Sequence, residues 1–521
     1  PPPPTPPPPP PPHPPPPPPP PPPAPPPPPP NTPPAGRTRA PTPPPPRRPL
    51  RGSIAIPLFI AFAYVCYKRY FQNRSKEETD IVIDKGVFLL VLAGITVWLA
   101  ASGIGGFWMQ SGDWHKHNAI LHDLIDYDWP VKYSLPEGDE GLLSYYIFSY
   151  LFPALVGKVA GFRWAELAML FQSIAGVLLV YLYLCHFLNM KEKRKQLFLF
   201  GLLVVFGGAV LAGKAVYGYF RPEDVSASFH WFSNTIQIQF SSHIVLMRWV
   251  FPQAIVPWLA TLLFLEGPDK VEDFAWTGLP IFMYSCFSFV GLLPFYIGMA
   301  LYQIGKERNF RGLCKQAFSI QNMYALFGVV PVFIMYIAGN VFQEKPEIVS
   351  LHRIDYSGNW ILYVTFCLSN FLLWSFFLWK QERSNPVFYI ANIVLLTLPL
   401  FWYGAYNDLC MRSCIPAFFI IAVLFYKYIL NVSITEKSRK LHILAVLCFL
   451  MVAAFPQTKE LYQNARFFSV EGAYRADVWG TLENQLVRDG TNDRVAYNYV
   501  AYDCGNRFFI KYMARRTGDG K

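Results

Sequence analysis

The sequence predicts an all-α polytopic membrane protein with roughly 11–12 transmembrane helices and one interfacial helix. Of its 521 residues, 52% are hydrophobic, 17% are aromatic and only 15% are charged, whereas soluble domains carry about 25% charged residues. The apolar residues come in blocks of about 17 to 25, the length of helix that crosses roughly 30 Å of hydrocarbon. Because backbone polar groups in lipid must bond within their own segment, we expect these blocks to be helical.

The apolar blocks mark the expected spans. They lie at residues 54–67, 86–107, 165–188, 197–217, 249–265, 275–304, 324–342, 360–380, 387–403, 415–430 and 441–456. Gly291 and Pro294 interrupt the longest block, 275–304. We therefore expect two short helices there, which meet at the outer face.

Clusters of lysine and arginine predict which loops face the cytoplasm. They gather between the apolar blocks, at residues 68–76, 191–195, 306–315, 380–383 and 437–440, and such clusters are typical of cytoplasmic loops. Two loops on one side must be separated by an even number of crossings. The ambiguous stretch 142–160 is therefore expected along the outer interface, with Tyr145, Tyr146 and Tyr150 at headgroup depth.

Both ends of the chain differ from the membrane region, which we expect to cover residues 51–456. Residues 1–50 are almost pure proline, which favours polyproline II or disordered chain and indicates a disordered or artefactual segment without a functional role. We expect authentic N-terminal sequence to be missing before residue 51. The polar tail 457–521 is expected on the outer face, where it can pack over an outer cavity.

Charge and cysteine content exclude several classes of protein. The net charge of +11 does not indicate nucleic-acid binding, because the basic residues lie in short loops and no soluble basic domain carries them. The expected spans hold almost no ionisable side chains in their interiors, and this argues against a proton-coupled transporter. The nine cysteines show no metal-ligand spacing.

The first outer loop contains the first candidate site, the motif SGDWHKHN at residues 111–118. A carboxylate just past a span is partly desolvated, which raises its pKa and suits Asp113 to accept a proton from a hydroxyl group. Alternatively, Asp113 caps the helix expected from about residue 117. His115 and His117 are candidate substrate-binding residues. With Asp113 they could also bind a divalent metal, although three potential ligands within five residues are weak evidence.

A second outer loop mixes polar and aromatic side chains, as sugar-binding sites do. Its candidate substrate-binding residues are His230, Gln237, His243 and Arg248. An interfacial aromatic belt with polar spacers is an equally good interpretation. Arg248 is the most informative of the four, because a guanidinium at the mouth of a span can hold a phosphate in bidentate fashion.

A third polar cluster contains Asn407, Asp408 and Arg412, at the outer end of two expected spans. Asp408 and Arg412 are four residues apart, so an ion pair on a helix surface is one interpretation. In the other, Arg412 holds a donor phosphate and Asn407 or Asp408 orients it.

The first outer loop resembles that of the glycosyltransferases of the C superfamily (GT-C), such as bacterial aminoarabinose transferases and protein O-mannosyltransferases. These proteins have a span, an acidic residue early in the first extracytoplasmic loop, an interfacial helix and a second span. Asp113 matches the acidic residue, 142–160 the interfacial helix and 164–188 the second span. Many of these families carry glutamate after the acidic residue, where this chain has Trp114.

The resemblance implies an inverting transfer of a sugar from a polyprenyl-phosphate or diphosphate donor to an acceptor hydroxyl, with Asp113 as general base. We expect Arg248 and Arg412 to stabilise the leaving phosphate, at the extracytoplasmic face of a bacterial plasma membrane. The expected partners are the lipid-linked sugar and membrane lipid, and the only cofactor considered is a divalent metal. The alternatives are a transporter or flippase of a lipid-linked substrate and a non-catalytic membrane assembly subunit.

Overall fold

The computed structural model of the chain describes residues 60–67, 83–110, 112–134, 140–228, 231–329, 350–404, 406–431, 443–455, 458, 462, 482 and 499–501. The chain divides into two units, Pro1–Pro46 and Arg47–Lys521. All described residues belong to the second unit. The proline-rich segment, most of the polar tail and most of the expected span 324–342 therefore lie outside the described residues.

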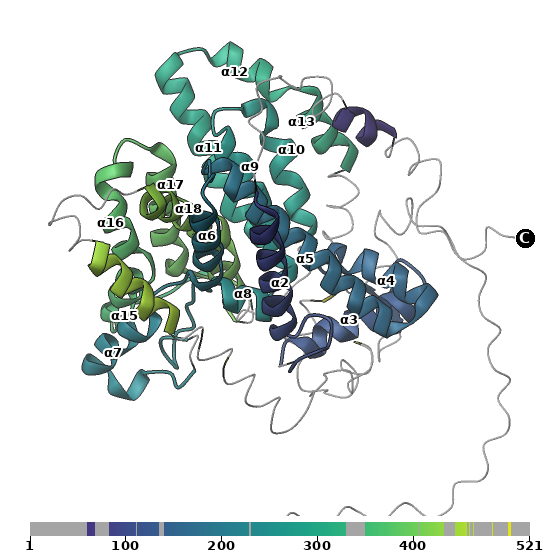
Figure 1. Cartoon of the computed structure of the whole chain (residues 1–521), viewed down its shortest axis with the longest axis horizontal. Coiled ribbons are helices and arrows are strands. Elements are labelled where there is room, and N and C mark those ends of the chain that lie inside the picture. The colour runs from purple at the N-terminus through teal and green to yellow at the C-terminus, as the bar shows by residue number, and fades with distance from the viewer. Residues whose placement is uncertain are drawn as a thin grey trace, which may run out of the picture. The chain divides into compact units, whose positions relative to one another are not determined.

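Helices make up most of the described part, as predicted (Figure 1). Five are long and apolar enough to cross a membrane: α5 (Phe162–Phe187), the α6 and α7 pair (Lys193–Phe220), α11 (Cys286–Glu307), the α15 and α16 pair (Trp360–Glu382) and α18 (Asp408–Asn431). A sixth candidate is bent by 116° between α8 (His243–Trp249) and Phe251–Glu266, which includes α9 (Ile255–Glu266). The described part is therefore an all-α membrane protein.

Among the described residues, the number of long helices is smaller than the roughly 11–12 spans expected for the whole chain from hydropathy. Four expected or ambiguous apolar blocks form shorter helices: α2 (Lys85–Ala101), α4 (Phe148–Ala160), α17 with the turn that follows it (Pro386–Leu400), and Ile443–Phe455. Each has 10–17 residues, whereas a helix normal to the bilayer needs about 20 residues to cross it. Hydropathy marked where these helices lie but overstated their length.

The block 275–304 does not form two helices that meet at Gly291 and Pro294, so that prediction was wrong. A short segment, α10 (Phe274–Gly278) with a 3₁₀ turn, ends before Ser285. The Ser285 side chain accepts a hydrogen bond from the backbone N–H of Ser288, and this cap starts α11. Helix α11 then continues through Gly291 and Pro294. A membrane helix tolerates a proline when neighbouring helices satisfy the backbone polar groups that the proline leaves free.

The stretch 142–160 is helical only from Phe148 onward. Before it, β2 (Glu140–Leu143) pairs antiparallel with β1 (Lys132–Ser134) and with β5 (Val500–Ala501), in the order β1-β2-β5. The tyrosines expected at headgroup depth, Tyr145, Tyr146 and Tyr150, are instead buried inside the protein. Their hydroxyl groups find partners there, so the three side chains do not face lipid.

Two ion pairs show which helix ends lie together. Asp84 caps α2 and its carboxylate lies 2.8 Å from Lys193 Nζ at the start of α6. At the far end of α18, Lys427 Nζ lies 3.9 Å from the Glu382 carboxylate at the end of α16. Because α2 begins and α18 ends beside basic clusters, the end of α2 and the start of α18 point away from them.

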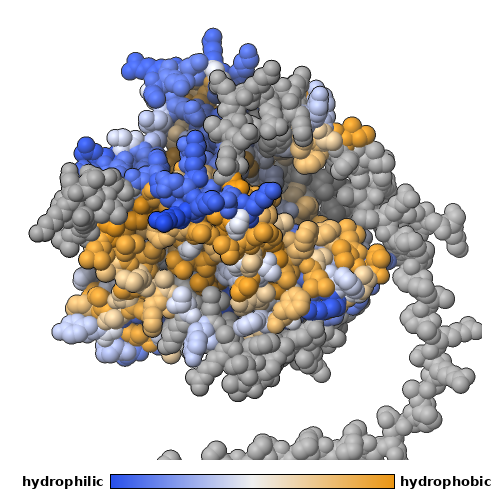
Figure 2. Space-filling view, in the orientation of Figure 1, coloured by the Kyte–Doolittle hydropathy of each residue, from blue (hydrophilic) through white to orange (hydrophobic). Residues whose placement is uncertain are grey.

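The two ends of the bundle also differ in surface polarity. In Figure 1, α12 (Phe310–Ala317) lies at the end opposite α3 (Trp114–Asp126). Figure 2 shows hydrophilic residues gathered over α12, with a broad hydrophobic surface below them that includes α2. The side chains of Leu89, Leu90 and Val97 on α2 are more than half exposed, as expected of residues that face lipid.

Candidate functional site

Asp113 and Lys116 form an ion pair at the start of α3. Lys116 Nζ lies 2.6 Å from Asp113 Oδ2. Asp113 occupies the N-terminal flanking position of α3, but its side chain accepts no capping hydrogen bond. The side chains are 35% exposed for Asp113 and 13% exposed for Lys116. The Asp113 carboxylate therefore reaches solvent, while the Lys116 side chain is largely enclosed. Because the Asp113 side chain accepts no capping hydrogen bond, the interpretation of Asp113 as a helix cap was wrong.

The charges around Asp113 hold its pKa below the ordinary value. Burial acts to raise the pKa of this carboxyl, but the positive charges of Lys116 and Arg412 outweigh it. The expectation that desolvation alone would raise the pKa of Asp113 was therefore wrong. Burial likewise opposes the charge on Lys116, yet Asp113 raises the pKa of the ammonium above its ordinary value. Both groups are charged at neutral pH.

Arg412, in the second turn of α18, anchors a buried chain of polar side chains. Its Nη2 lies 2.9 Å from Asp408 Oδ1, and its Nη1 donates to Gln253 Oε1 at 2.9 Å. Gln253 in turn donates to the Tyr145 hydroxyl at 3.0 Å. The predicted ion pair between Asp408 and Arg412 is confirmed. It is not an exposed surface pair, because both side chains are only 11% exposed.

The C-terminal strand adds Tyr499 to this region. The backbone N–H of Ser144 donates to the Tyr499 carbonyl at 2.8 Å, and the rings of Tyr145 and Tyr499 are 4.8 Å apart. Burial raises the pKa of the Tyr499 hydroxyl, and the positive charges of Lys116 and Arg412 act in the opposite direction. Residues 499–501 of the tail thus pack against β2 and Tyr145.

These side chains form one group, which we call the Asp113–Arg412 cluster. It consists of Asp113, Lys116, Tyr145, Gln253, Asp408, Arg412 and Tyr499. The electrostatic influence of Arg412 reaches both Asp113 and Lys116. Five segments far apart in the sequence supply the cluster, so its geometry depends on the whole bundle.

His117 is a structural residue beside the cluster. Its Nε2 lies 3.0 Å from the Trp249 carbonyl oxygen, which can only accept, so Nε2 carries the proton. Nδ1 then accepts from the Tyr150 hydroxyl. Burial, aided by the charge of Lys116, lowers the pKa of His117 to about 3. With both ring nitrogens engaged, His117 has no lone pair left for a metal or a substrate.

No metal site emerges from the histidines of the first loop. His115 lies half-buried on α3 between Asp113 and His117. Among the described residues, no group of three His, Cys, Asp or Glu side chains is arranged to hold a metal ion. The divalent metal considered from the sequence therefore has no set of ligands in this part of the chain.

Arg248 lies at the end of α8, next to the loop that carries Asp113. Its guanidinium lies 5.6 Å from the ring centroid of Trp249. The Trp249 ring also faces Gly112, with its Cζ3 3.7 Å from the position that a Cβ of Gly112 would take. The end of α8 therefore lies against Gly112, the residue before Asp113. Arg248 itself is only 7% exposed.

Asn407 and Gln237, which the sequence suggested as substrate-binding residues, stabilise the fold beside the Asp113–Arg412 cluster. Asn407 has a positive φ of 56° and donates to the Gln237 carbonyl at 3.2 Å. Its Oδ1 accepts from the Cys410 backbone N–H at 3.4 Å, at the start of α18. Only the backbone of Gln237 takes part in this contact. Asn407 therefore joins the loop that contains Gln237 to the helix that carries Arg412.

His243 lies in the aromatic core and not in the cluster. Its Nδ1 donates to the Leu203 carbonyl at 2.6 Å, and the rings of Phe206, Trp258 and Phe419 surround it. A substrate cannot reach a side chain that is 1% exposed in this position. His230 lies outside the described residues.

Sequence reasoning missed Lys116, Tyr145, Gln253 and Tyr499 as members of the site. For Lys116 a pattern was available, because residues three apart on a helix are neighbours and Lys116 follows Asp113 by three. No local pattern marks the other three, which meet through tertiary contacts.

No family model, curated protein or solved structure matches this chain.

Proposed function

We propose that the chain is an inverting glycosyltransferase that uses a polyprenyl-phosphate or diphosphate sugar, as the resemblance of its first outer loop implies. One observation carries the proposal: the Asp113 carboxylate is ionised, partly exposed and within the electrostatic reach of Arg412, with Lys116 Nζ at 2.6 Å. A proton acceptor beside two cations is the combination that attack on a phosphate-linked sugar requires.

In this mechanism the acceptor hydroxyl oxygen attacks the anomeric carbon while the bond from that carbon to the phosphate oxygen breaks. The hydroxyl proton passes to Asp113, and the bonding electron pair leaves with the phosphate. Lys116 and Arg412 stabilise the negative charge that develops on the phosphate. Arg248 precedes Trp249, whose ring contacts Gly112. It is the third cation that stabilises the leaving phosphate.

The same ion pair can couple donor binding to base strength. With no donor bound, Lys116 lowers the pKa of Asp113 and weakens it as a base. A phosphate that accepts a hydrogen bond from Lys116 shares that positive charge and adds a negative one nearby. Both effects raise the pKa of the Asp113 carboxyl, so the base becomes stronger when the donor is in place.

The position of the cluster favours transfer over transport. The cluster lies where α2 ends and α18 begins, near the ends of helices and away from their middle turns. Transporters generally hold their ionisable groups near the middle of the membrane. Arg412 also lowers the pKa of Asp113, and this interaction argues against the non-catalytic subunit, for which the two residues have no need to interact.

The proposal is tested in proteoliposomes that contain the purified chain, a radiolabelled polyprenyl-phosphate sugar and a panel of hydroxyl acceptors. We expect sugar transfer by the wild-type chain and a loss of about a hundredfold or more for Asp113→Asn. The control Asp126→Asn removes an exposed carboxylate at the other end of α3 and should retain full activity.

Three outcomes would contradict the proposal. Full activity of Asp113→Asn would remove this residue as the base. Movement of the labelled lipid between leaflets, without any transferred or released sugar, would identify a flippase. Neither transfer nor movement with any donor in the panel would favour the assembly subunit.

A further inference from the structure

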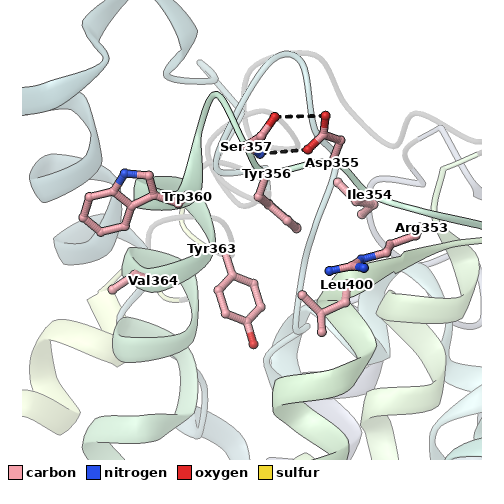
Figure 3. A pocket seen from close by; sticks show the side chains of 9 residues that line it. All are labelled: Arg353, Ile354, Asp355, Tyr356, Ser357, Trp360, Tyr363, Val364 and Leu400. Atoms are coloured by element: carbon pink, nitrogen blue, oxygen red, sulfur yellow. Dashed lines mark hydrogen bonds between the residues drawn. The ribbon is translucent and has the colours of Figure 1, made fainter.

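A groove separate from the Asp113–Arg412 cluster opens at the start of α15 (Trp360–Cys367). It has a volume of about 550 Å³, and its lining includes Arg353, Asp355, Trp360, Tyr363, Val364 and Leu400. Figure 3 shows Trp360, Tyr363 and Val364 on the α15 side and Arg353 and Ile354 across from them. A short strand pair, β3 (His352–Arg353) with β4 (Phe401–Trp402), holds the second wall.

The mouth of the groove carries one positive and one negative side chain. Arg353 and Asp355 are both exposed. The Asp355 carboxylate accepts hydrogen bonds from Ser357, at 2.8 Å from its backbone N–H and at 3.0 Å from its hydroxyl. These bonds, with a smaller effect from Arg353, keep the pKa of Asp355 below its ordinary value. The mouth therefore presents two opposite charges with no net charge.

The rest of the groove is apolar and lies at the end of a candidate membrane span. Trp360, Tyr363 and Val364 occupy one face of the first turns of the span Trp360–Glu382. The hydroxyls of Tyr356 and Tyr363 donate to the carbonyls of Pro399, at 2.7 Å, and Leu396, at 2.9 Å. The two tyrosines thus offer their rings to the groove and not their polar groups. The Trp360 side chain is 62% exposed, as in aromatic belts at the membrane surface.

We propose that this groove binds one aminophospholipid of the phosphatidylethanolamine class. The lipid phosphate pairs with Arg353, its ammonium pairs with Asp355, and an acyl chain lies along Trp360, Val364 and Leu400. Charge complementarity selects this occupant, because only a zwitterionic headgroup satisfies both side chains at the mouth. An anionic lipid, including a polyprenyl phosphate, meets repulsion from Asp355. The site is independent of the proposed enzymatic activity.

Native mass spectrometry of the purified chain, titrated in detergent with phosphatidylethanolamine or phosphatidylglycerol of identical acyl chains, tests the proposal. We expect one molecule of phosphatidylethanolamine to bind about fivefold more tightly than phosphatidylglycerol, the effect of a single exposed charge pair. Asp355→Asn should remove this preference, because it weakens phosphatidylethanolamine binding and relieves the repulsion of phosphatidylglycerol. Arg353→Gln should weaken binding of both lipids by about fivefold.

The matched control is Arg311→Gln, which removes an arginine from α12 and should leave both affinities unchanged. Arg353 and Asp355 are exposed, so their variants should keep the wild-type unfolding temperature. Equal binding of the two lipids by the wild-type chain would overturn the proposal. Unchanged affinities in Arg353→Gln would do the same, and tighter binding of polyprenyl phosphate would assign the groove to the donor lipid instead.

Discussion

Gly291 on α11 lies directly against the carbonyl oxygen of Ser413 on α18, so closely that a Cβ at residue 291 would overlap it. Two hydrogen bonds from Ser288, one turn earlier on α11, reach the carbonyls of Arg412 at 3.2 Å and Gln253 at 3.4 Å. Close approach of the two helices therefore sets the backbone position of Arg412 and of its hydrogen-bond partner Gln253. The glycine that hydropathy marked as a helix break is a packing residue.

Replacement of Gly291 by alanine should push α18 away from α11, because the overlap is with backbone and not with a flexible side chain. We expect a loss of about 1–3 kcal/mol in stability, the usual cost of overpacking. If the Asp113–Arg412 cluster is the active site, transfer should fall as well, since Arg412 moves with the helix. Unfolding temperature in detergent and initial transfer rate are the two measurements.

Gly305→Ala is the matched control, because it lies on the same helix and a Cβ there meets no atom within 4 Å. Alanine favours helix over glycine by up to about 1 kcal/mol, so this variant should be as stable as the wild type or slightly more stable. If both alanine variants behaved alike, the contact with Ser413 would not control the packing of α11.

The contrast between α5 and α11 shows what hydropathy can predict. The block 165–188 contains no proline and forms α5 (Phe162–Phe187) almost as predicted. In α11, the effect of Gly291 depends on Ser413, more than a hundred residues later. Likewise, Leu142 and Leu143 lie in a strand because they pair with Ala501 and Val500. Local patterns cannot reveal partners so distant in sequence.

The candidate site shows the same division. The ion pair between Asp408 and Arg412 follows from a spacing of four residues and could be predicted. Gln253 and Tyr499 belong to the cluster only because the bent pair of helices and the C-terminal strand bring them there. The pKa of Asp113 was predicted in the wrong direction, because the positive charge and hydrogen bond of Lys116, with a smaller effect of Arg412 on α18, outweigh burial.

The ion pair between Asp113 and Lys116 predicts a specific pH dependence. A general base works as the carboxylate, so activity rises with pH through the pKa of Asp113, which lies below the ordinary value of about 3.9. Lys116→Gln removes the nearest positive charge and leaves the effect of burial, which raises that pKa. The acidic limb of kcat/KM should therefore move to higher pH, and the measurement is a pH–rate profile between pH 3 and 8.

Lys132→Gln is the control for this shift, since it removes an exposed lysine from β1. Its acidic limb should match that of the wild type. An unchanged limb in Lys116→Gln, with lower activity at every pH, would mean that Lys116 binds the donor without affecting the base.

His117 provides a pH-dependent contribution to stability that is separate from catalysis. It is held neutral between the Tyr150 hydroxyl and the Trp249 carbonyl, and its pKa of about 3 lies far below that of an exposed histidine, about 6.5. Between these two values the unfolded chain binds a proton that the folded chain does not. The stabilisation is therefore complete above about pH 6.5 and is lost as the pH falls toward 3, by up to about 1.4 kcal/mol per pH unit.

His117→Gln should remove this part of the pH dependence, so its unfolding temperature should fall less steeply than that of the wild type between pH 6.5 and 4. Its stability at pH 7.5 should also be lower, because glutamine cannot satisfy both partners in the same geometry. His352→Gln changes an exposed histidine and should keep the wild-type slope. Identical slopes for His117→Gln and the wild type would show that His117 is protonated in the folded chain and that its two hydrogen bonds do not hold it neutral.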